Sequence, residues 1–135
     1  QSGNVVLTSD RDPTAVQGAL EAALAKHLGQ PVPVVIRTAA ALAEEHAANP
    51  FADAPGNHAY LMFFDRPLAP DVLDGLVAPG GERVARGPRV LYLHYPDGMG
   101  RSKLRVPGAS AGTARNLNTV AKLVAMCAEA TPVRG

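Results

Sequence analysis

The chain has 135 residues, 47% of them hydrophobic and 19% charged, and its formal net charge at pH 7 is +1. This composition is typical of a globular protein and excludes an intrinsically disordered chain. No apolar run approaches the roughly 18 residues that a membrane-spanning helix needs, and the single cysteine, Cys127, excludes an intrachain disulfide. We therefore expect a cytoplasmic protein that forms one compact unit, with no membrane association and no cofactor.

The charges are unevenly distributed along the chain. Residues 1–75 hold four basic and nine acidic side chains, whereas residues 76–135 hold nine basic and three acidic ones. A positive surface raises the local concentration of anions, so this asymmetry is an argument about binding partners. The same asymmetry also fits a solvated basic surface, or one half of the protein docking on the other.

The first expected elements are a strand and a helix. Residues 5–8 follow a Gly-Asn turn sequence and are predicted to be the return strand of a hairpin whose partner would precede Gln1. Asp12 is the expected N-cap of a helix with Pro13 at its first position, and Gly29 ends it. Apolar residues recur along this helix at a spacing of four: Val16, Leu20, Leu24 and Leu28.

A strand over residues 32–37 is expected next, placed toward a sheet edge by its prolines. Thr38 then caps a helix over residues 39–48, which an Asn-Pro pair terminates. The segment 49–57 is rich in proline, glycine and asparagine, which makes it the best candidate for a subdomain boundary. The chain is accordingly divided into an N-terminal α+β part, residues 1–48, and a C-terminal α+β part, residues 49–135.

The second part is expected to combine a central strand, a hairpin and two helices. Residues 60–64 form a continuous apolar strand, and residues 70–77 a short helix. Residues 83–86 and 89–95 flank a Gly-Pro turn and are predicted to be a β-hairpin. The last helix is expected over residues 116–130, with Cys127 on its apolar stripe as a small core residue.

The sequence Gly-Arg-Ser-Lys-Leu at residues 100–104, called the basic tract below, is the strongest candidate for a binding site. Arginine forks onto phosphate or carboxylate oxygens, and N–H groups in glycine-bearing turns and at helix N-termini point toward anions. A second polar set lies where the last helix is expected to begin. The candidate ligand-binding residues are Arg101, Ser102, Lys103, Arg115, Asn116, Thr119 and Lys122.

Several other kinds of site lack support in the sequence. The basic tract does not match the nucleotide P-loop, because Arg101 rather than lysine follows Gly100. The four histidines have no metal-ligand spacing. A catalytic triad of Ser102, His94 and Asp97 has no nucleophile-elbow sequence behind it, so the sequence assigns no reaction. Stacking on nucleic-acid bases is not indicated either, since the tract contains no aromatic residue.

Several blocks of the chain resemble those of the bacterial domain-of-unknown-function family 1697, in the order found there. The blocks are Gln1 to Val6, Asn49-Pro50-Phe51, the basic tract and residues 115–123. The resemblance implies an α+β protein of two small subdomains, with mixed or antiparallel sheets and helices packed on one face. Its first subdomain would resemble part of a split β-α-β (ferredoxin-like) unit. The resemblance implies no established activity, and the family's first strand and helix would precede Gln1.

Two hypotheses of different classes follow. The chain is either a binding module, or part of an enzyme, that holds a phosphate-bearing small molecule or a nucleic-acid backbone with Arg101, Lys103 and Arg115. Alternatively, it is a structural domain whose basic tract docks on acidic surface, within the chain or across a homodimer formed through an open sheet edge.

Overall fold

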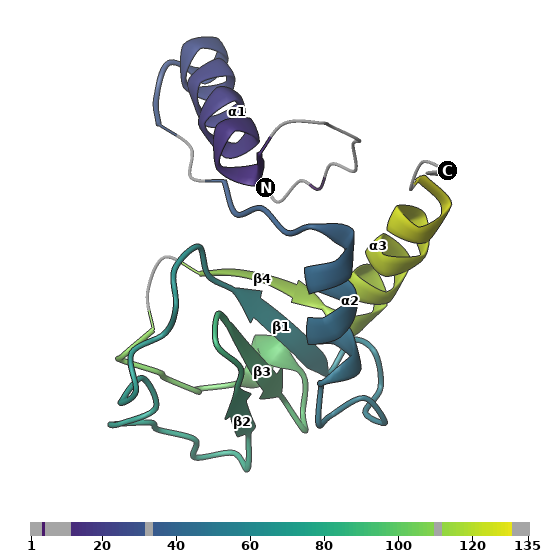
Figure 1. Ribbon diagram of the computed structural model, residues 1–135. Helices are drawn as coiled ribbons and strands as arrows, with labels where there is room; N and C mark the ends of the chain where they lie inside the picture. Colours follow the sequence, from purple (N-terminus) through teal and green to yellow (C-terminus); the bar gives the residue numbers. More distant parts are fainter. Residues whose placement is uncertain (1–3, 5–11, 32–33, 110–111, 131–135) are drawn as a thin grey trace.

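The computed structural model describes residue 4 and residues 12–31, 34–109 and 112–130, and these form an α+β fold (Figure 1). The elements in chain order are α1 (Pro13–Leu28), α2 (Ala39–Ala47), β1 (Ala59–Phe63), β2 (Arg83–Arg86), β3 (Val90–His94), the 3-10 helix η1 (Met99–Arg101), β4 (Thr113–Asn116) and α3 (Leu117–Ala130). The predicted α+β class is therefore confirmed. None of the helices in this part of the chain has the length and apolarity to cross a bilayer.

The four strands form one antiparallel sheet in the order β2-β3-β1-β4. Leu61 of β1 is opposite Tyr92 of β3 and Arg115 of β4, so these three side chains point to the same face. On that face α2 and α3 cover the sheet (Figure 1). The other face is covered by the irregular segments 64–78 and 102–109.

Each face of the sheet has its own apolar core. On the helix side, Leu42 of α2 and Val120 of α3 pack with Leu61, Val90 and Tyr92. The opposite core is made by Phe64, Val72, Leu91, Leu93 and Tyr95. Each fully buried leucine or valine contributes roughly 1.5–3 kcal/mol by leaving water, so the two cores hold the sheet between its covering layers. Leu42, from the predicted N-terminal part, shares this core with residues of the predicted C-terminal part. The division of the chain into two parts at residue 48 stays a prediction.

Helix α1 begins and ends as its sequence predicts. The Asp12 side chain accepts a hydrogen bond from the backbone N–H of Thr14, Pro13 is the first helical residue, and Gly29 closes the helix with a φ of 74°. None of its residues is buried, although Leu20 and Leu24 are half-buried. The helix lies outside the layered body of the sheet (Figure 1).

The strand expected over residues 32–37 is wrong for the part that the structure describes, since residues 34–37 are not in a strand. The backbone of Val34 is occupied by side chains of α1 instead. Its carbonyl accepts from Gln17 Nε2 at 2.6 Å, and its N–H donates to Glu21 Oε2 at 3.0 Å. With both groups engaged in this way, Val34 has no free backbone group for a strand partner.

The helix expected over residues 70–77 is also wrong, because the segment forms successive turns. Its N–H groups donate three residues back, as from Val72 to the Ala69 carbonyl and from Asp74 to the Asp71 carbonyl. Gly75 has a φ of 78°, which ends the turns before a helical hydrogen-bond ladder can form. Val77 then pairs with Arg105 in an isolated antiparallel bridge.

The remaining predictions are confirmed with small shifts, apart from one missed strand. The central strand, the hairpin and the helix capped by Thr38 are present as β1, β2–β3 and α2. Residues 113–116 form the edge strand β4, and the last helix begins one residue after it. The strand predicted over residues 5–8 lies outside the described residues.

Candidate anion-binding site

The basic tract is anchored to the sheet through Ser102. Its hydroxyl donates to Glu82 Oε2 at 2.7 Å and accepts from the N–H of Leu104 at 3.0 Å. Glu82 immediately precedes β2 and is only 9% exposed, and its second oxygen accepts from the N–H of Gly80 at 2.9 Å. The hydrogen bond from Ser102, followed by those from the backbone, lowers the pKa of the Glu82 carboxyl below its ordinary value. Ser102 is therefore an anchor of this loop, held by an ionised carboxylate.

The cationic side chains next to this anchor are exposed. Arg101, Lys103 and Arg105 all reach solvent. A shallow depression of about 450 Å³ is lined by Ser102, Lys103, Leu104 and Arg105. None of these three cations forms a salt bridge with any residue that the structure describes. The geometry adds Arg105 to the candidates; its alternation with Leu104 and Val106, whose side chains pack inward, is the pattern that could have identified it.

Arg115 lies in a different place from the basic tract. It is in β4, at the sheet edge opposite β2, and faces the helix side together with Leu61. Leu104 of the tract packs in the core of the other face. The Arg115 guanidinium donates to Asn4 Oδ1 at 2.9 Å and to Thr113 Oγ1 and the Ala114 carbonyl, each at 2.8 Å. The structure therefore does not bring Arg115 and the tract together on one face.

The other predicted residues belong to the start and first turns of α3. Asn116 Oδ1 accepts from the backbone N–H of Thr119 at 2.9 Å, which is the bond of an N-cap. Thr119 is half-buried, and Lys122 is exposed one turn further along. Asn116 thus has a structural role at the helix start, and Lys122 presents its charge to solvent.

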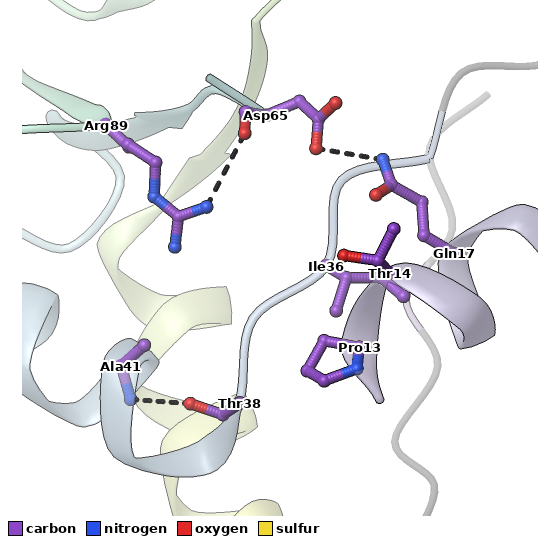
Figure 2. A pocket seen from close by; sticks show the side chains of 8 residues that line it. All are labelled: Pro13, Thr14, Gln17, Ile36, Thr38, Ala41, Asp65 and Arg89. Atoms are coloured by element: carbon purple, nitrogen blue, oxygen red, sulfur yellow. Dashed lines mark hydrogen bonds between the residues drawn. The ribbon is translucent and has the colours of Figure 1, made fainter. Parts of the chain in front are cut away.

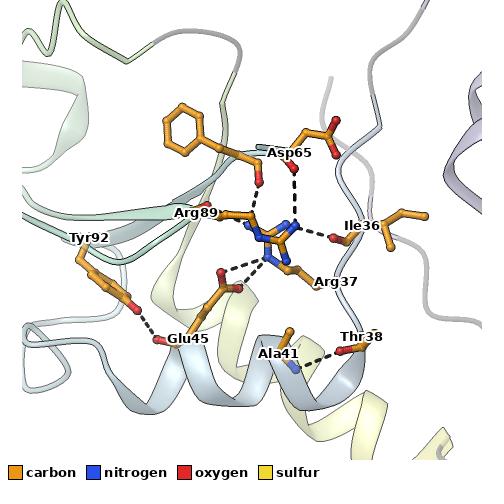
Figure 3. A network of polar contacts seen from close by, with 9 residues as sticks. Ile36, Arg37, Thr38, Ala41, Glu45, Asp65, Arg89 and Tyr92 are labelled. Atoms are coloured by element: carbon orange, nitrogen blue, oxygen red, sulfur yellow. Dashed lines mark hydrogen bonds and ion pairs between the residues drawn. The ribbon is translucent and has the colours of Figure 1, made fainter. Parts of the chain in front are cut away.

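A second polar network joins α2 to the ends of β1 and β3 (Figure 3). The Arg37 side chain is 6% exposed and its Nε donates to both oxygens of Glu45, at 2.8 and 3.1 Å. Its terminal nitrogens donate to the carbonyls of Ile36, Phe64 and Arg89 at 2.8 to 3.0 Å. Because each of its three nitrogen atoms donates to a neighbouring group, we assign this buried arginine a structural role and not a ligand-binding one.

The histidines and the cysteine do not form a metal site among the residues that the structure describes. His94 is at the end of β3, with its ring centre 5.7 Å from that of Phe51, and its buried Nδ1 has no hydrogen-bond partner in the part of the chain that the structure describes. Burial, with smaller effects from Arg83 and His58, lowers the pKa of His94 below its ordinary value. Cys127 packs against the helix-side core, as its place on the α3 stripe predicts.

Comparison with known proteins gives one match. The family model described as a protein of unknown function (DUF1697) matches residues 1–92. No curated protein and no solved structure matches the chain. The match spans more than half of the 135 residues and includes α1, α2, β1, β2 and the first three residues of β3. The chain therefore belongs to the DUF1697 family of proteins of unknown function.

Proposed function

We propose that the protein binds a phosphate-bearing ligand at the depression beside the basic tract. Lys103 and Arg105 supply the positive charge, and Arg101 extends it at the end of η1. Lysine binds a phosphate as a point charge and arginine as a two-pronged donor, so the pair suits a tetrahedral oxyanion. Lys122 and Arg115 stand outside this depression, and we restrict the proposal to the tract.

The observation that carries the proposal is that exposed cations, with no ion-pair partner among the described residues, belong to an anchored loop. Ser102 is hydrogen-bonded to the buried Glu82, and Leu104 and Val106 pack against the core below. A loop fixed in this way presents its cations at low entropic cost to a ligand. The depression is open and shallow, which favours a terminal phosphate or an exposed phosphate chain over a fully enclosed metabolite.

The experiment compares inorganic phosphate, pyrophosphate and a single-stranded oligonucleotide by titration calorimetry and fluorescence anisotropy. The double substitution Lys103→Ala with Arg105→Ala is expected to weaken binding at least about tenfold. It should also reduce by roughly two the number of counterions released when the oligonucleotide binds, as measured from the salt dependence of its affinity. Lys26→Ala is the matched control, because Lys26 is an exposed cation of α1 remote from the tract. Equal binding by the double variant, or no binding of any probe by the wild type, overturns the proposal.

The alternative function, in which the tract docks on acidic surface of the same chain, has less support. Among the described residues the basic tract forms no ion pair, and it contacts the Glu82 carboxylate through the Ser102 hydroxyl and the Lys103 backbone. Docking across a homodimer is tested by the same double variant. If the wild type sediments as a dimer and the variant as a monomer, the docking function replaces the ligand-binding one.

A further inference from the structure

A cavity of about 200 Å³ lies between the start of α1 and the body of the protein (Figure 2). Thr14 and Gln17 line it from α1, and Ile36 and Thr38 from the segment that leads into α2. Asp65 and Arg89 complete it, one following β1 and the other preceding β3. These residues belong to the end of the sheet away from Glu82 and the basic tract, because β2 starts and β3 ends at that other end.

Two opposite charges line this cavity without neutralising each other. No salt bridge joins Asp65 and Arg89 in the described part of the chain. The Asp65 carboxylate turns toward α1, where Oδ1 accepts from Gln17 Nε2 at 2.9 Å, and Figure 2 shows the Arg89 guanidinium on the other side of the cavity. Among the described residues, that guanidinium makes one hydrogen bond, a long one of 3.5 Å from Nη1 to the Asp65 backbone carbonyl.

Both charged groups have capacity for a further partner. A guanidinium has five N–H donors, and Arg89 uses one of them on a residue that the structure describes. The second oxygen of Asp65 has no partner there either, since Gln17 bonds Oδ1. The Thr38 hydroxyl accepts from the N–H of Ala41 at 3.1 Å and keeps its own proton for donation. The cavity therefore presents donors on one side and a carboxylate on the other.

We propose that this cavity binds a free α-amino acid, with the ligand's carboxylate on Arg89 and its ammonium group on Asp65. A zwitterion of this kind satisfies both charges at once, which neither a simple anion nor a simple cation does. The volume corresponds to roughly six or seven water molecules, which suits a single small or medium amino acid. Ile36 and Pro13 provide an apolar wall for an aliphatic side chain.

The position of the α2 N-terminus agrees with this orientation. Thr38 is the N-cap of α2, and the cavity includes Ala41 in the first turn. The positive end of a helix dipole stabilises an anion nearby. The ligand's carboxylate would therefore lie between the guanidinium and the first turn of α2, with its ammonium group directed toward α1.

The proposal is tested by titrating the wild-type chain with single amino acids, and with their amide and N-acetyl derivatives, in a thermal shift assay and by calorimetry. We expect at least one small or medium aliphatic amino acid to bind and to raise the melting temperature. The amide lacks the negative charge and the N-acetyl form lacks the positive one, so each should bind at least about tenfold more weakly. These derivatives test the charge requirement without any change to the protein.

Two substitutions then assign the charges. Arg89→Gln and Asp65→Asn should each abolish the amino-acid response, whereas Arg86→Gln and Asp71→Asn, which change matched residues outside the cavity, should preserve it. Equal binding of the N-acetyl derivative, equal binding by Arg89→Gln, or no response to any amino acid overturns the proposal. The proposal would also be overturned if Asp65→Asn bound the amino acid as well as the wild type and inorganic phosphate displaced it. That result would indicate a simple anion site.

Discussion

Arg37 joins three parts of the fold that are distant in the sequence. Its guanidinium bonds Glu45 of α2, the Phe64 carbonyl after β1 and the Arg89 carbonyl before β3, and it lies 5.4 Å from the centre of the Phe63 ring. The carbonyl of Glu45 in turn accepts from the Tyr92 hydroxyl at 2.8 Å. One buried side chain thus ties α2 to the adjacent ends of two strands.

Replacing Arg37 with alanine should lower the free energy of unfolding by about 3–5 kcal/mol, because the largely buried Glu45 carboxylate loses its cationic partner and the Phe64 carbonyl loses the hydrogen bond from Arg37. Arg37→Lys keeps the charge but not the planar fork, so it should recover only part of this loss. Urea denaturation measures both changes. The control Arg66→Ala alters an exposed arginine and should change the free energy by less than about 0.5 kcal/mol. A similarly small effect of Arg37→Ala would contradict the assigned role.

His94 makes stability depend on pH near neutrality. Folding lowers its pKa, so below the unfolded value of about 6.5 the unfolded chain binds more protons than the folded one. The stability that neutral His94 contributes is therefore complete above that pH and is lost as the pH falls below it and through the lower pKa of the folded state. We expect the melting temperature to fall on acidification across this window.

The variant His94→Phe should flatten that pH dependence, because it keeps an aromatic ring against Phe51 and removes the titrating group. His27→Gln, which changes an exposed histidine of α1, should leave the slope as it is in the wild type. Melting curves at several pH values compare the two. The same slope in His94→Phe as in the wild type would show that another group is responsible.

At the scale of elements, the segment that covers the second face of the sheet depends on one close backbone approach. A Cβ on Gly108 would meet the backbone carbonyl of Val72 and lie 3.0 Å from its carbon atom. Backbone atoms cannot move aside as a flexible side chain can, so the two covering segments would have to separate. Glycine at this position therefore allows residues 102–109 to pack against the turns that carry Val72.

Gly108→Ala should lower the free energy of unfolding by about 1–3 kcal/mol through this overlap. Gly100→Ala is the matched control, since a Cβ there has no atom within 4 Å beyond its neighbours. Chemical denaturation of the two variants gives the comparison. If Gly108→Ala is as stable as Gly100→Ala, the backbones at Gly108 and Val72 do not pack as closely as proposed.

The elements that the sequence predicts well are those with local signals. Asp12 with Pro13, Thr38 and Gly29 fix helix ends through bonds within a few residues, and each was identified by its residue type alone. Strand β4 was missed because its sequence, Thr-Ala-Arg-Asn, has no apolar alternation and is extended through its pairing with β1. Residues 34–37 have the composition of a strand, yet side chains of Gln17 and Glu21 occupy the backbone of Val34.

The candidate site was predicted in part for the same reason. Residue type and loop position were enough to identify Arg101 and Lys103 as exposed cations. The placement of Arg115 on the opposite face follows from the register of β4 on β1, which no local pattern reveals. Asp65 and Arg89 line one cavity only because β1 ends beside the start of β3, a contact made by antiparallel pairing between segments far apart in the sequence.

At the scale of the whole molecule, the acidic and basic halves of the sequence are not two separate lobes. Strand β1 comes from the acidic half and lies between β3 and β4, both from the basic half. The interleaving spreads the two signs of charge over one body, so the overall asymmetry does not by itself create a positive face. Any strong anion attraction must then come from local groups such as the basic tract.

The burial of Arg37 has a consequence for limited digestion by trypsin. The enzyme must draw the arginine that it recognises into its own specificity pocket, and at 6% exposure the Arg37 guanidinium is withheld from it in the native state. Cutting after Lys103 needs no such release, because that side chain already faces solvent. Cleavage of the Arg37–Thr38 peptide bond therefore requires the Arg37 hydrogen bonds to open. The cleavage rate reports how often the native chain opens locally between α2 and the sheet.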